Sequence, residues 1–166
     1  EIGPGKGALT EKILSAGATV LAVEKDNDLL EFLHGKFANE LDKKKFVLVH
    51  EDILDFSPDT HRLRKGEYKI IANIPYNITG AILKKFLSGE SQPERMVLMV
   101  QNEVAKRIVA RDNKESLLSI SVKAYGTPSI VTKVPARYFS PAPKVDSAVI
   151  LIQNIFTKYS LFRIII

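Results

Sequence analysis

The chain opens with Glu1-Ile2-Gly3-Pro4-Gly5-Lys6-Gly7, a turn in which glycine stands at every second position. Glycine adopts positive φ angles without strain and lets a ligand approach the backbone closely. A helical pattern over residues 7–16 follows, and then an apolar strand pattern over residues 19–24. A glycine-rich turn that opens a helix and leads into a buried strand is typical of α/β proteins that bind a nucleoside cofactor. The stretch therefore predicts both the fold class and a ligand site.

Strand and helix patterns alternate along the rest of the chain, which is typical of a doubly wound α/β sheet. The remaining predicted helices cover residues 28–41, 80–87, 103–110 and 117–124. The remaining predicted strands cover residues 46–50, 68–72, 96–100, 130–134 and 148–152. The last two flank the loop 135–144, and their close spacing predicts an antiparallel hairpin at one edge of a mostly parallel sheet. The predicted fold class is a Rossmann-like doubly wound sheet.

Both ends of the sequence look cut. A sheet of this kind has its first strand just before the glycine turn, yet Glu1 would be the last residue of that strand. We expect the natural polypeptide to carry this strand and a further C-terminal part. Residues 1–153 are expected to form one domain, and residues 154–166 the start of a linker or a C-terminal domain.

Acidic residues end the second and third strands of this pattern, where ligands bind in open α/β sheets. Glu24 lies about twenty residues after the turn and is placed to accept both hydroxyls of a ribose. Asp52 can accept from the amine of the cofactor's adenine while Ile53 packs on the ring, and Glu1 can bind an amino group. The alternatives are a strand-end carboxylate at Glu24 and a turn-forming aspartate at position 52. The glycine spacing differs from GxGxxG, which favours a methyltransferase over a dehydrogenase.

Asn73-Ile74-Pro75-Tyr76 follows the strand predicted over residues 68–72. The amine of adenine is a poor nucleophile, because its lone pair is delocalised into the ring. Two acceptors, the Asn73 side-chain oxygen and the Pro75 carbonyl, can draw the amine protons out of plane and stabilise the cationic transition state. Tyr76 can stack on the base. Together with the glycine turn, the stretch predicts methyl transfer from S-adenosylmethionine to an adenine amine; the alternative is a strand-ending turn with an aromatic plug.

Phe139 lies in the loop 135–144 between Tyr138 and the prolines Pro141 and Pro143, whose rings stiffen the loop. It can be held out to meet the face of an adenine opposite Tyr76, and such a sandwich offsets the cost of unstacking the nucleotide. The alternative is that Phe139 fills the core beside the last strand.

Basic residues are concentrated in the second half of the chain. Residues 1–72 hold 11 Lys and Arg against 13 Asp and Glu, whereas residues 73–166 hold 13 against 6. The second half is therefore the one expected to face a polyanion such as RNA. The candidate contacts are Lys106, Arg107, Arg111 and Lys144, and the alternative is that these charges form an ordinary solvated surface.

Several classes of site are not indicated by the composition. The chain has no cysteine and therefore no disulfide or thiolate metal site, which fits a reducing compartment. Its three histidines, His34, His50 and His61, lack ligand spacing and are expected to be structural or exposed, so we expect no metal. No apolar run reaches the roughly 18 residues of a membrane span.

Five ordered stretches resemble the rRNA adenine dimethyltransferase family of the KsgA type: Glu1–Thr10, Ala22–Asp26, Asn73–Thr79, Met96–Ala110 and Phe139–Val149. The resemblance implies a class I S-adenosylmethionine-dependent methyltransferase that dimethylates adjacent adenosines in a small-subunit rRNA hairpin loop. It implies that Asn73, Tyr76 and Phe139 hold the target base, and that Gly3, Gly5, Glu24, Asp52 and Asn73 line the cofactor pocket. The family's helical C-terminal domain is absent from this sequence.

The same resemblance implies a partner and a location. The partner is small-subunit rRNA or the immature small ribosomal subunit, with no membrane, and we expect a monomer in the cytoplasm. Two alternatives stay open. One is the related family that methylates large-subunit rRNA and confers macrolide resistance, although the stretch Lys144–Ala148 argues against it. The other is a non-catalytic ribosome-assembly or transcription factor on the same fold.

Overall fold

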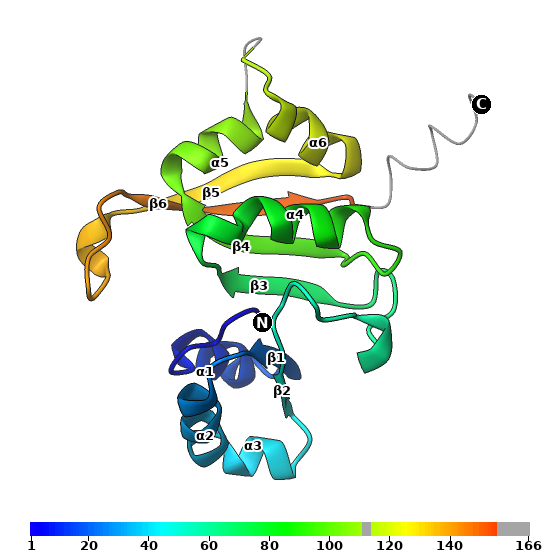
Figure 1. Ribbon diagram of the computed structural model, residues 1–166, viewed down its shortest axis with the longest axis vertical. Coiled ribbons are helices and arrows are strands. Elements are labelled where there is room, and N and C mark those ends of the chain that lie inside the picture. The colour runs from blue at the N-terminus through cyan, green and yellow to red at the C-terminus, as the bar shows by residue number, and fades with distance from the viewer. Residues whose placement is uncertain (111–113, 156–166) are drawn as a thin grey trace. The chain divides into compact units, whose positions relative to one another are not determined.

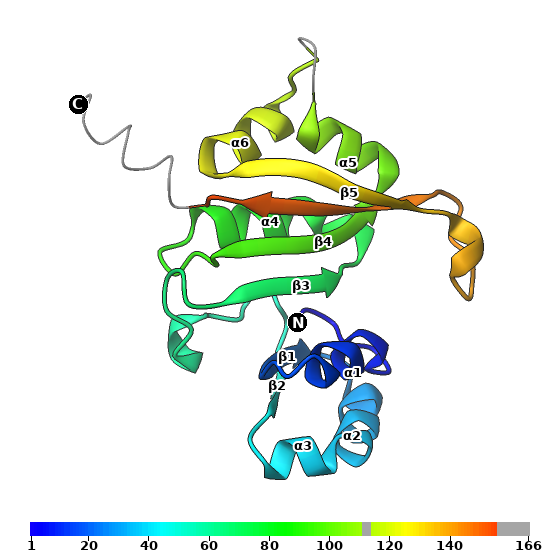
Figure 2. The same ribbon diagram turned by 180° about the vertical axis from the view of Figure 1, so that it is seen from behind.

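The computed structural model describes residues 1–110 and 114–155, and Figures 1 and 2 show it from opposite sides. The chain divides into two compact units. The first contains Glu1–Ser57 and Ile71–Asn73, and the second contains Pro58–Ile70 and the chain from Ile74 onward. The residues of the predicted site are divided between the two units.

The first unit is built around two parallel strands, β1 (Val20–Glu24) and β2 (Phe46–His50). The pairing runs from Val20 opposite Phe46 to Glu24 opposite His50, so both strands end side by side. Just before the glycine turn, Ile2 makes an isolated parallel bridge to Val23. The helices of this unit are α1 (Ala8–Ser15), α2 (Asn27–Lys36) and α3 (Ala38–Asp42).

The helix predicted over residues 28–41 is two helices, α2 and α3, which meet at Phe37. Phe37 has φ −114° and ψ 27°, outside the helical region, while its N–H still bonds to the Leu33 carbonyl. Its ring is buried and packs edge-on against Phe46, with 5.2 Å between the centroids. The apolar spacing predicts one inward face of Leu30, Leu33, Phe37 and Leu41; the first three are buried, and Leu41 is half-buried against the same core. The backbone therefore turns at Phe37, where the ring packs against the first residue of β2.

Most of a four-stranded sheet in the order β3-β4-β6-β5 belongs to the second unit, while Ile71–Asn73 of β3 belong to the first. Its strands are β3 (Lys69–Asn73), β4 (Arg95–Gln101), β5 (Thr127–Val134) and β6 (Ser147–Gln153). The helices of the second unit are α4 (Thr79–Ser88), α5 (Asn102–Val109) and α6 (Leu117–Tyr125), with short 3-10 turns η1 (Asp59–His61), η2 (Tyr76–Ile78) and η3 (Ala136–Tyr138). The helical pattern over residues 80–87 predicts one buried face, and Ile82, Leu83, Phe86 and Leu87 of α4 are all buried.

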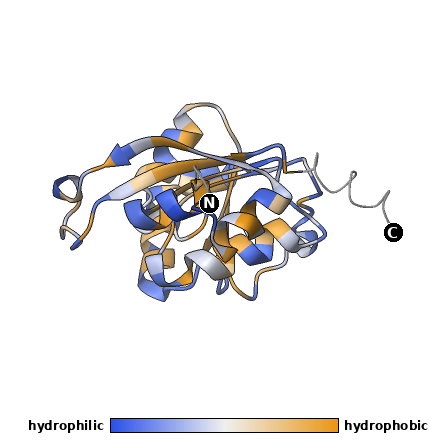
Figure 3. Cartoon of the chain, turned by 90° about the horizontal axis from the view of Figure 1, so that it is seen from above, coloured by the Kyte–Doolittle hydropathy of each residue, from blue (hydrophilic) through white to orange (hydrophobic). Residues whose placement is uncertain are grey.

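The last strand of the sheet, β6, lies between β4 and β5 and is antiparallel to both. The predicted antiparallel hairpin at a sheet edge is confirmed, since β5 has no further partner in the strand order. β5 begins at Thr127, earlier than predicted, and its register shifts between Ile130 and Thr132. The loop that joins the two strands is mainly hydrophilic and projects to the left in Figure 3.

The described residues contain neither a membrane-spanning helix nor a group of metal-ligating side chains. Within residues 1–110 and 114–155, no helix is long and apolar enough to cross a membrane. Over the same residues, no three side chains of the His, Cys, Asp or Glu type are grouped so that they could hold a metal ion.

Candidate functional site

The glycine turn of the first unit has the backbone geometry that its sequence predicts. Gly3 and Gly5 have φ angles of 58° and 55°, in the left-handed region that glycine favours. A Cβ atom at either position would meet no atom within 4 Å. The turn is closed by two backbone hydrogen bonds, from Gly3 N to Val23 O at 3.0 Å and from Gly7 N to Pro4 O at 2.9 Å. The space beside Gly3 and Gly5 is therefore open for a ligand to approach the backbone.

Glu24 is the last residue of β1, and the residue is only 7% exposed. One carboxylate oxygen, Oε1, accepts from the backbone N–H groups of Lys25 at 2.9 Å and Asp26 at 3.1 Å. The other, Oε2, accepts from Gly5 N at 3.4 Å. These N–H groups fix the carboxylate against the glycine turn. The two features that the sequence proposed for a cofactor, the turn and this acid, thus lie in contact.

Glu1 lies at the start of the turn, and its Oε2 accepts from the Thr10 hydroxyl at 2.5 Å. Burial raises the pKa of the Glu1 carboxyl, while the hydrogen bond from Thr10 opposes that shift. Thr10 is itself fully buried in α1. Glu1 was predicted to belong to the site, whereas the contact with Thr10 was not predicted.

Asp52 follows β2 and starts a turn. Its Oδ1 accepts from Leu54 N at 2.9 Å, and its Oδ2 lies 3.5 Å from the Lys25 ammonium. The hydrogen bond from Leu54, together with the Lys25 charge, holds the pKa of Asp52 below its usual value. Ile53 beside it is buried. Asp52 thus has the turn-forming contact that the alternative interpretation requires, and its ion pair joins it to the residue that follows Glu24.

The Asn-Ile-Pro-Tyr stretch begins at the last residue of β3. Asn73 and Pro75 are exposed, whereas Ile74 between them is buried and anchors the stretch. Pro75 has φ −59° and ψ 132°, and Tyr76 follows as the first residue of η2. Tyr76 is half-buried, and its hydroxyl lies 2.6 Å from the Ser147 Oγ in the second unit.

The loop that carries Phe139 follows η3, and Phe139 itself is half-buried. Its backbone N–H donates to Ala136 O at 3.1 Å. Asp146 closes the loop, since its Oδ1 accepts from Ala136 N at 2.9 Å. The structure therefore shows a loop tied at its base. The sequence predicted no role for Asp146 or Ser147, although both lie within the stretch Phe139–Val149.

Of the predicted RNA contacts, Lys106 and Arg107 are exposed in the last turn of α5, and Lys144 is exposed in the loop before β6. Arg111 lies outside the described residues. Arg107 also borders a groove of about 510 Å³ between α4 and α6.

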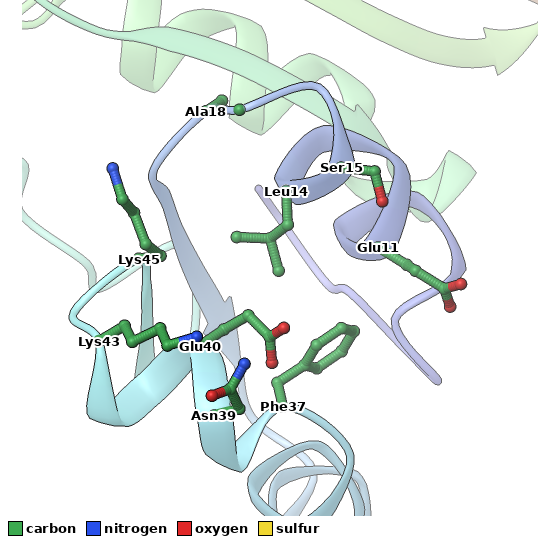
Figure 4. A pocket seen from close by; sticks show the side chains of 10 residues that line it. Glu11, Leu14, Ser15, Ala18, Phe37, Asn39, Glu40, Lys43 and Lys45 are labelled. Atoms are coloured by element: carbon green, nitrogen blue, oxygen red, sulfur yellow. The ribbon is translucent and has the colours of Figure 1, made fainter.

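A separate pocket of about 290 Å³ lies in the first unit between α1 and α3 (Figure 4). The side chains of Leu14, Phe37 and Glu40 point into it, and Lys43 and Lys45 stand at its side. None of the residues predicted to bind a cofactor lines this pocket.

Solved structures with the same fold define the class. The fold is that of the class I methyltransferases, the class to which similar structures belong. A dimethyladenosine transferase from Plasmodium falciparum matches with a TM-score of 0.80 and 26% identity over 96% of this chain and 56% of its own. The 23S rRNA methyltransferase ErmE matches with a TM-score of 0.75 and 27% identity over 92% of this chain and 59% of its own. The predicted fold class is thereby confirmed.

The chain belongs to the ribosomal RNA adenine dimethylase family, whose sequence model matches residues 1–161. A relative from Dehalococcoides mccartyi, ribosomal RNA small subunit methyltransferase A, is 47% identical over 152 residues, which cover 92% of this chain and 51% of the relative. The protein of the same name from Thermosynechococcus vestitus is 41% identical over 92% of this chain and 57% of its own length. The chain thus spans about half the length of these relatives. Membership of the family implies S-adenosylmethionine as the methyl donor.

Proposed function

We propose that this chain transfers methyl groups from S-adenosylmethionine to the exocyclic amines of adjacent adenosines in a hairpin loop of small-subunit rRNA. The observation that carries the proposal is the Asn-Ile-Pro-Tyr stretch at the end of β3, where Asn73 and Pro75 are exposed and Tyr76 is anchored through its hydroxyl. The 47% identity to a small subunit methyltransferase supports this choice of substrate.

The residues of the first unit fit the methyl donor. Gly3 and Gly5 leave open space beside the backbone, and Glu24 and Asp52 present carboxylates at neighbouring strand ends. In the proposal, Glu24 accepts from the ribose hydroxyls, Asp52 accepts from the adenine amine, Ile53 contacts the adenine, and Glu1 holds the amino group. The bound cofactor supplies an electrophilic methyl group on a sulfonium.

The chain's own contribution to the reaction is to orient the target amine. The Asn73 side-chain oxygen and the Pro75 carbonyl accept its two protons, which directs the nitrogen lone pair away from the ring. Acceptors at these positions bind the cationic transition state more strongly than the neutral base. Tyr76 and Phe139 hold the base between their rings, and each stacking contact contributes about 1–3 kcal/mol.

The basic residues hold the RNA by its phosphates. Lys106, Arg107, Arg111 and Lys144 are the proposed contacts, and they provide affinity without reading sequence. The proposed partner is small-subunit rRNA within the immature small ribosomal subunit, on which the chain acts as a monomer in the cytoplasm.

A second candidate is the methylation of large-subunit rRNA, which the similarity to ErmE favours. The two candidates differ in substrate, so the purified chain should be given immature small subunits and deproteinised large-subunit rRNA in parallel. The proposal expects radiolabelled methyl groups in small-subunit rRNA alone. Label confined to large-subunit rRNA would support the second candidate, and RNA binding without label in either would indicate a non-catalytic factor.

The substitution Asn73→Ala tests the assignment of the amine acceptor. We expect single-turnover methylation to fall by about 100-fold or more, the effect of removing one such electrostatic contact. Because the contact strengthens only as the amine becomes cationic, affinity for S-adenosylmethionine should change far less. Asn73→Asp keeps an acceptor oxygen and should retain more activity than the alanine variant. Equal losses of rate and cofactor affinity in Asn73→Ala would make Asn73 a cofactor residue instead.

A further inference from the structure

Ser147 lies at a rigid point of the second unit. It is the first residue of β6, and its side chain is fully buried. Its backbone pairs with Gln101 of β4 on one side and with Val134 of β5 on the other. A buried residue that is paired on both sides belongs to the least mobile part of a fold.

The Ser147 hydroxyl connects this rigid point to Tyr76. The two side-chain oxygens are 2.6 Å apart, so one hydroxyl donates to the other, although the residues are 71 positions apart in the sequence. At its other end, Tyr76 is held by the backbone of η2, which starts directly after Pro75. The tyrosine ring is therefore fixed both at its Cβ and at its hydroxyl, and it cannot rotate about χ1 without breaking the hydrogen bond.

Asp146 fixes the loop that carries Phe139. Its Oδ1 accepts from Ala136 N at 2.9 Å, which joins the two ends of the loop. Its carbonyl accepts from Asn102 N at 2.9 Å, which ties the same residue to the start of α5. One pair of neighbouring residues therefore holds the Tyr76 ring, through Ser147, and the loop that carries Phe139, through Asp146.

We propose that Asp146 and Ser147 are positioning residues for the target base, Ser147 through the Tyr76 ring and Asp146 through the Phe139 loop. This inference rests on the proposed function, because the fixed ring and the closed loop can position a base only if Tyr76 and Phe139 bind one. Neither residue touches the reacting atoms. Their effect is to order the two aromatic side chains before the RNA arrives, so that binding does not have to restrict them.

A double-mutant cycle tests the role of Ser147. Ser147→Ala and Tyr76→Phe each remove one partner of the same hydrogen bond. Each should lower kcat/KM for RNA by about threefold to tenfold, the equivalent of one neutral hydrogen bond. The double variant should be no worse than either single variant, since the bond can be lost only once. Affinity for S-adenosylmethionine should stay within about twofold. Losses that multiply in the double variant, or that extend equally to the cofactor, would overturn the inference.

Ser119→Ala is the matched control for a general effect on stability. Ser119 is also a fully buried serine of the second unit, and its hydroxyl donates to the Ser116 carbonyl at 2.8 Å. The control should lower the melting temperature without changing kcat/KM for RNA of the folded protein. An equal loss of kcat/KM in the control would overturn the inference. If Ser147→Ala fails to fold, Tyr76→Phe carries the same expectation without altering the strand.

Asp146 is tested by a conservative pair of variants. Asp146→Ala removes the acceptor for Ala136 N, whereas Asp146→Asn keeps an oxygen in that place. The alanine variant should raise KM for RNA several-fold, and the asparagine variant should restore most of the wild-type value. Equal defects in both variants would overturn the positioning role, because a lost acceptor would not then explain them.

Ring motion provides a measurement that needs no substrate. In NMR spectra of protein with isotope-labelled tyrosine, the Tyr76 resonances are identified by their loss in Tyr76→Phe. They should broaden or average in Ser147→Ala and remain sharp in Ser119→Ala. If the wild-type chain methylates no RNA, the proposed function is wrong. A change of the Tyr76 resonances in Ser147→Ala would then still show that the hydrogen bond between the two residues restrains the ring. Unchanged ring resonances in Ser147→Ala would overturn the inference whatever the activity.

Discussion

Gly7→Ala should destabilise the first unit strongly, and the structure provides the magnitude. Gly7 has φ +76°, where a residue with a side chain costs about 1–2 kcal/mol. An added Cβ would lie 2.4 Å from Phe37 Cε2, 2.8 Å from Phe37 Cζ and 3.1 Å from Leu33 Cδ2. The Phe37 ring cannot retreat freely because it packs on Phe46 and both are buried. Such overpacking costs about 1–3 kcal/mol, so we expect a total loss of about 2–5 kcal/mol.

Equilibrium unfolding in urea, followed by far-UV circular dichroism, measures this loss. Gly17→Ala is the matched control, since Gly17 has φ +85° and no atom lies within 4 Å of an added Cβ. The control carries the backbone strain alone, and Gly7→Ala should exceed it by the packing part, about 1–3 kcal/mol. If Gly7→Ala is no more destabilising than Gly17→Ala, the packing of Phe37 against the turn does not restrict that position and the reasoning is refuted.

Three further predictions concern ligand contacts. Glu24→Ala should weaken binding of S-adenosylmethionine by about 1–3 kcal/mol in isothermal titration, and Asp52→Ala should also weaken it; unchanged affinity in both would remove the proposed cofactor site. Replacing Lys106 and Arg107 together should flatten the slope of log K against log salt by about 1–2 units if both touch phosphate, whereas an indifferent slope would put the RNA on another face. Phe139→Ala should leave the melting temperature nearly unchanged and cut methylation strongly, because truncating a phenylalanine in a packed core would cost about 3–5 kcal/mol and a half-buried loop residue should not.

Local patterns in the sequence were sufficient for most of the fold. Helix α4 shows why, since its apolar spacing requires one buried face and the structure buries that whole face. β2 was predicted at its observed bounds because it is a short run of β-branched and apolar residues. The break at Phe37 was missed because the apolar period continues through it, and only the packing of its ring against Phe46 shows why the backbone turns.

The candidate site was predictable where its residues are neighbours in sequence. Gly3 and Gly5 were identified because their spacing reflects backbone conformation, and the structure gives both of them positive φ. The contact between Tyr76 and Ser147 could not be predicted, since it joins residues 71 positions apart and depends on β6 lying beside β4. Asp52 remains a prediction, because the turn it forms with Leu54 is compatible with either interpretation.

The position of β6 between β4 and β5 also affects how the protein is made. A ribosome synthesises β4 (Arg95–Gln101) long before β6 (Ser147–Gln153) and β5 (Thr127–Val134) directly before it, so during translation β4 remains without the strand that separates it from β5. Sheet pairing between distant segments is slow, and exposed strand edges are prone to aggregate in the meantime. A nascent chain released before residue 147 would leave β5 without its partner strand and Tyr76 without its anchor. The synthesis of β6 thus completes both this sheet and the hydrogen bond that fixes the Tyr76 ring.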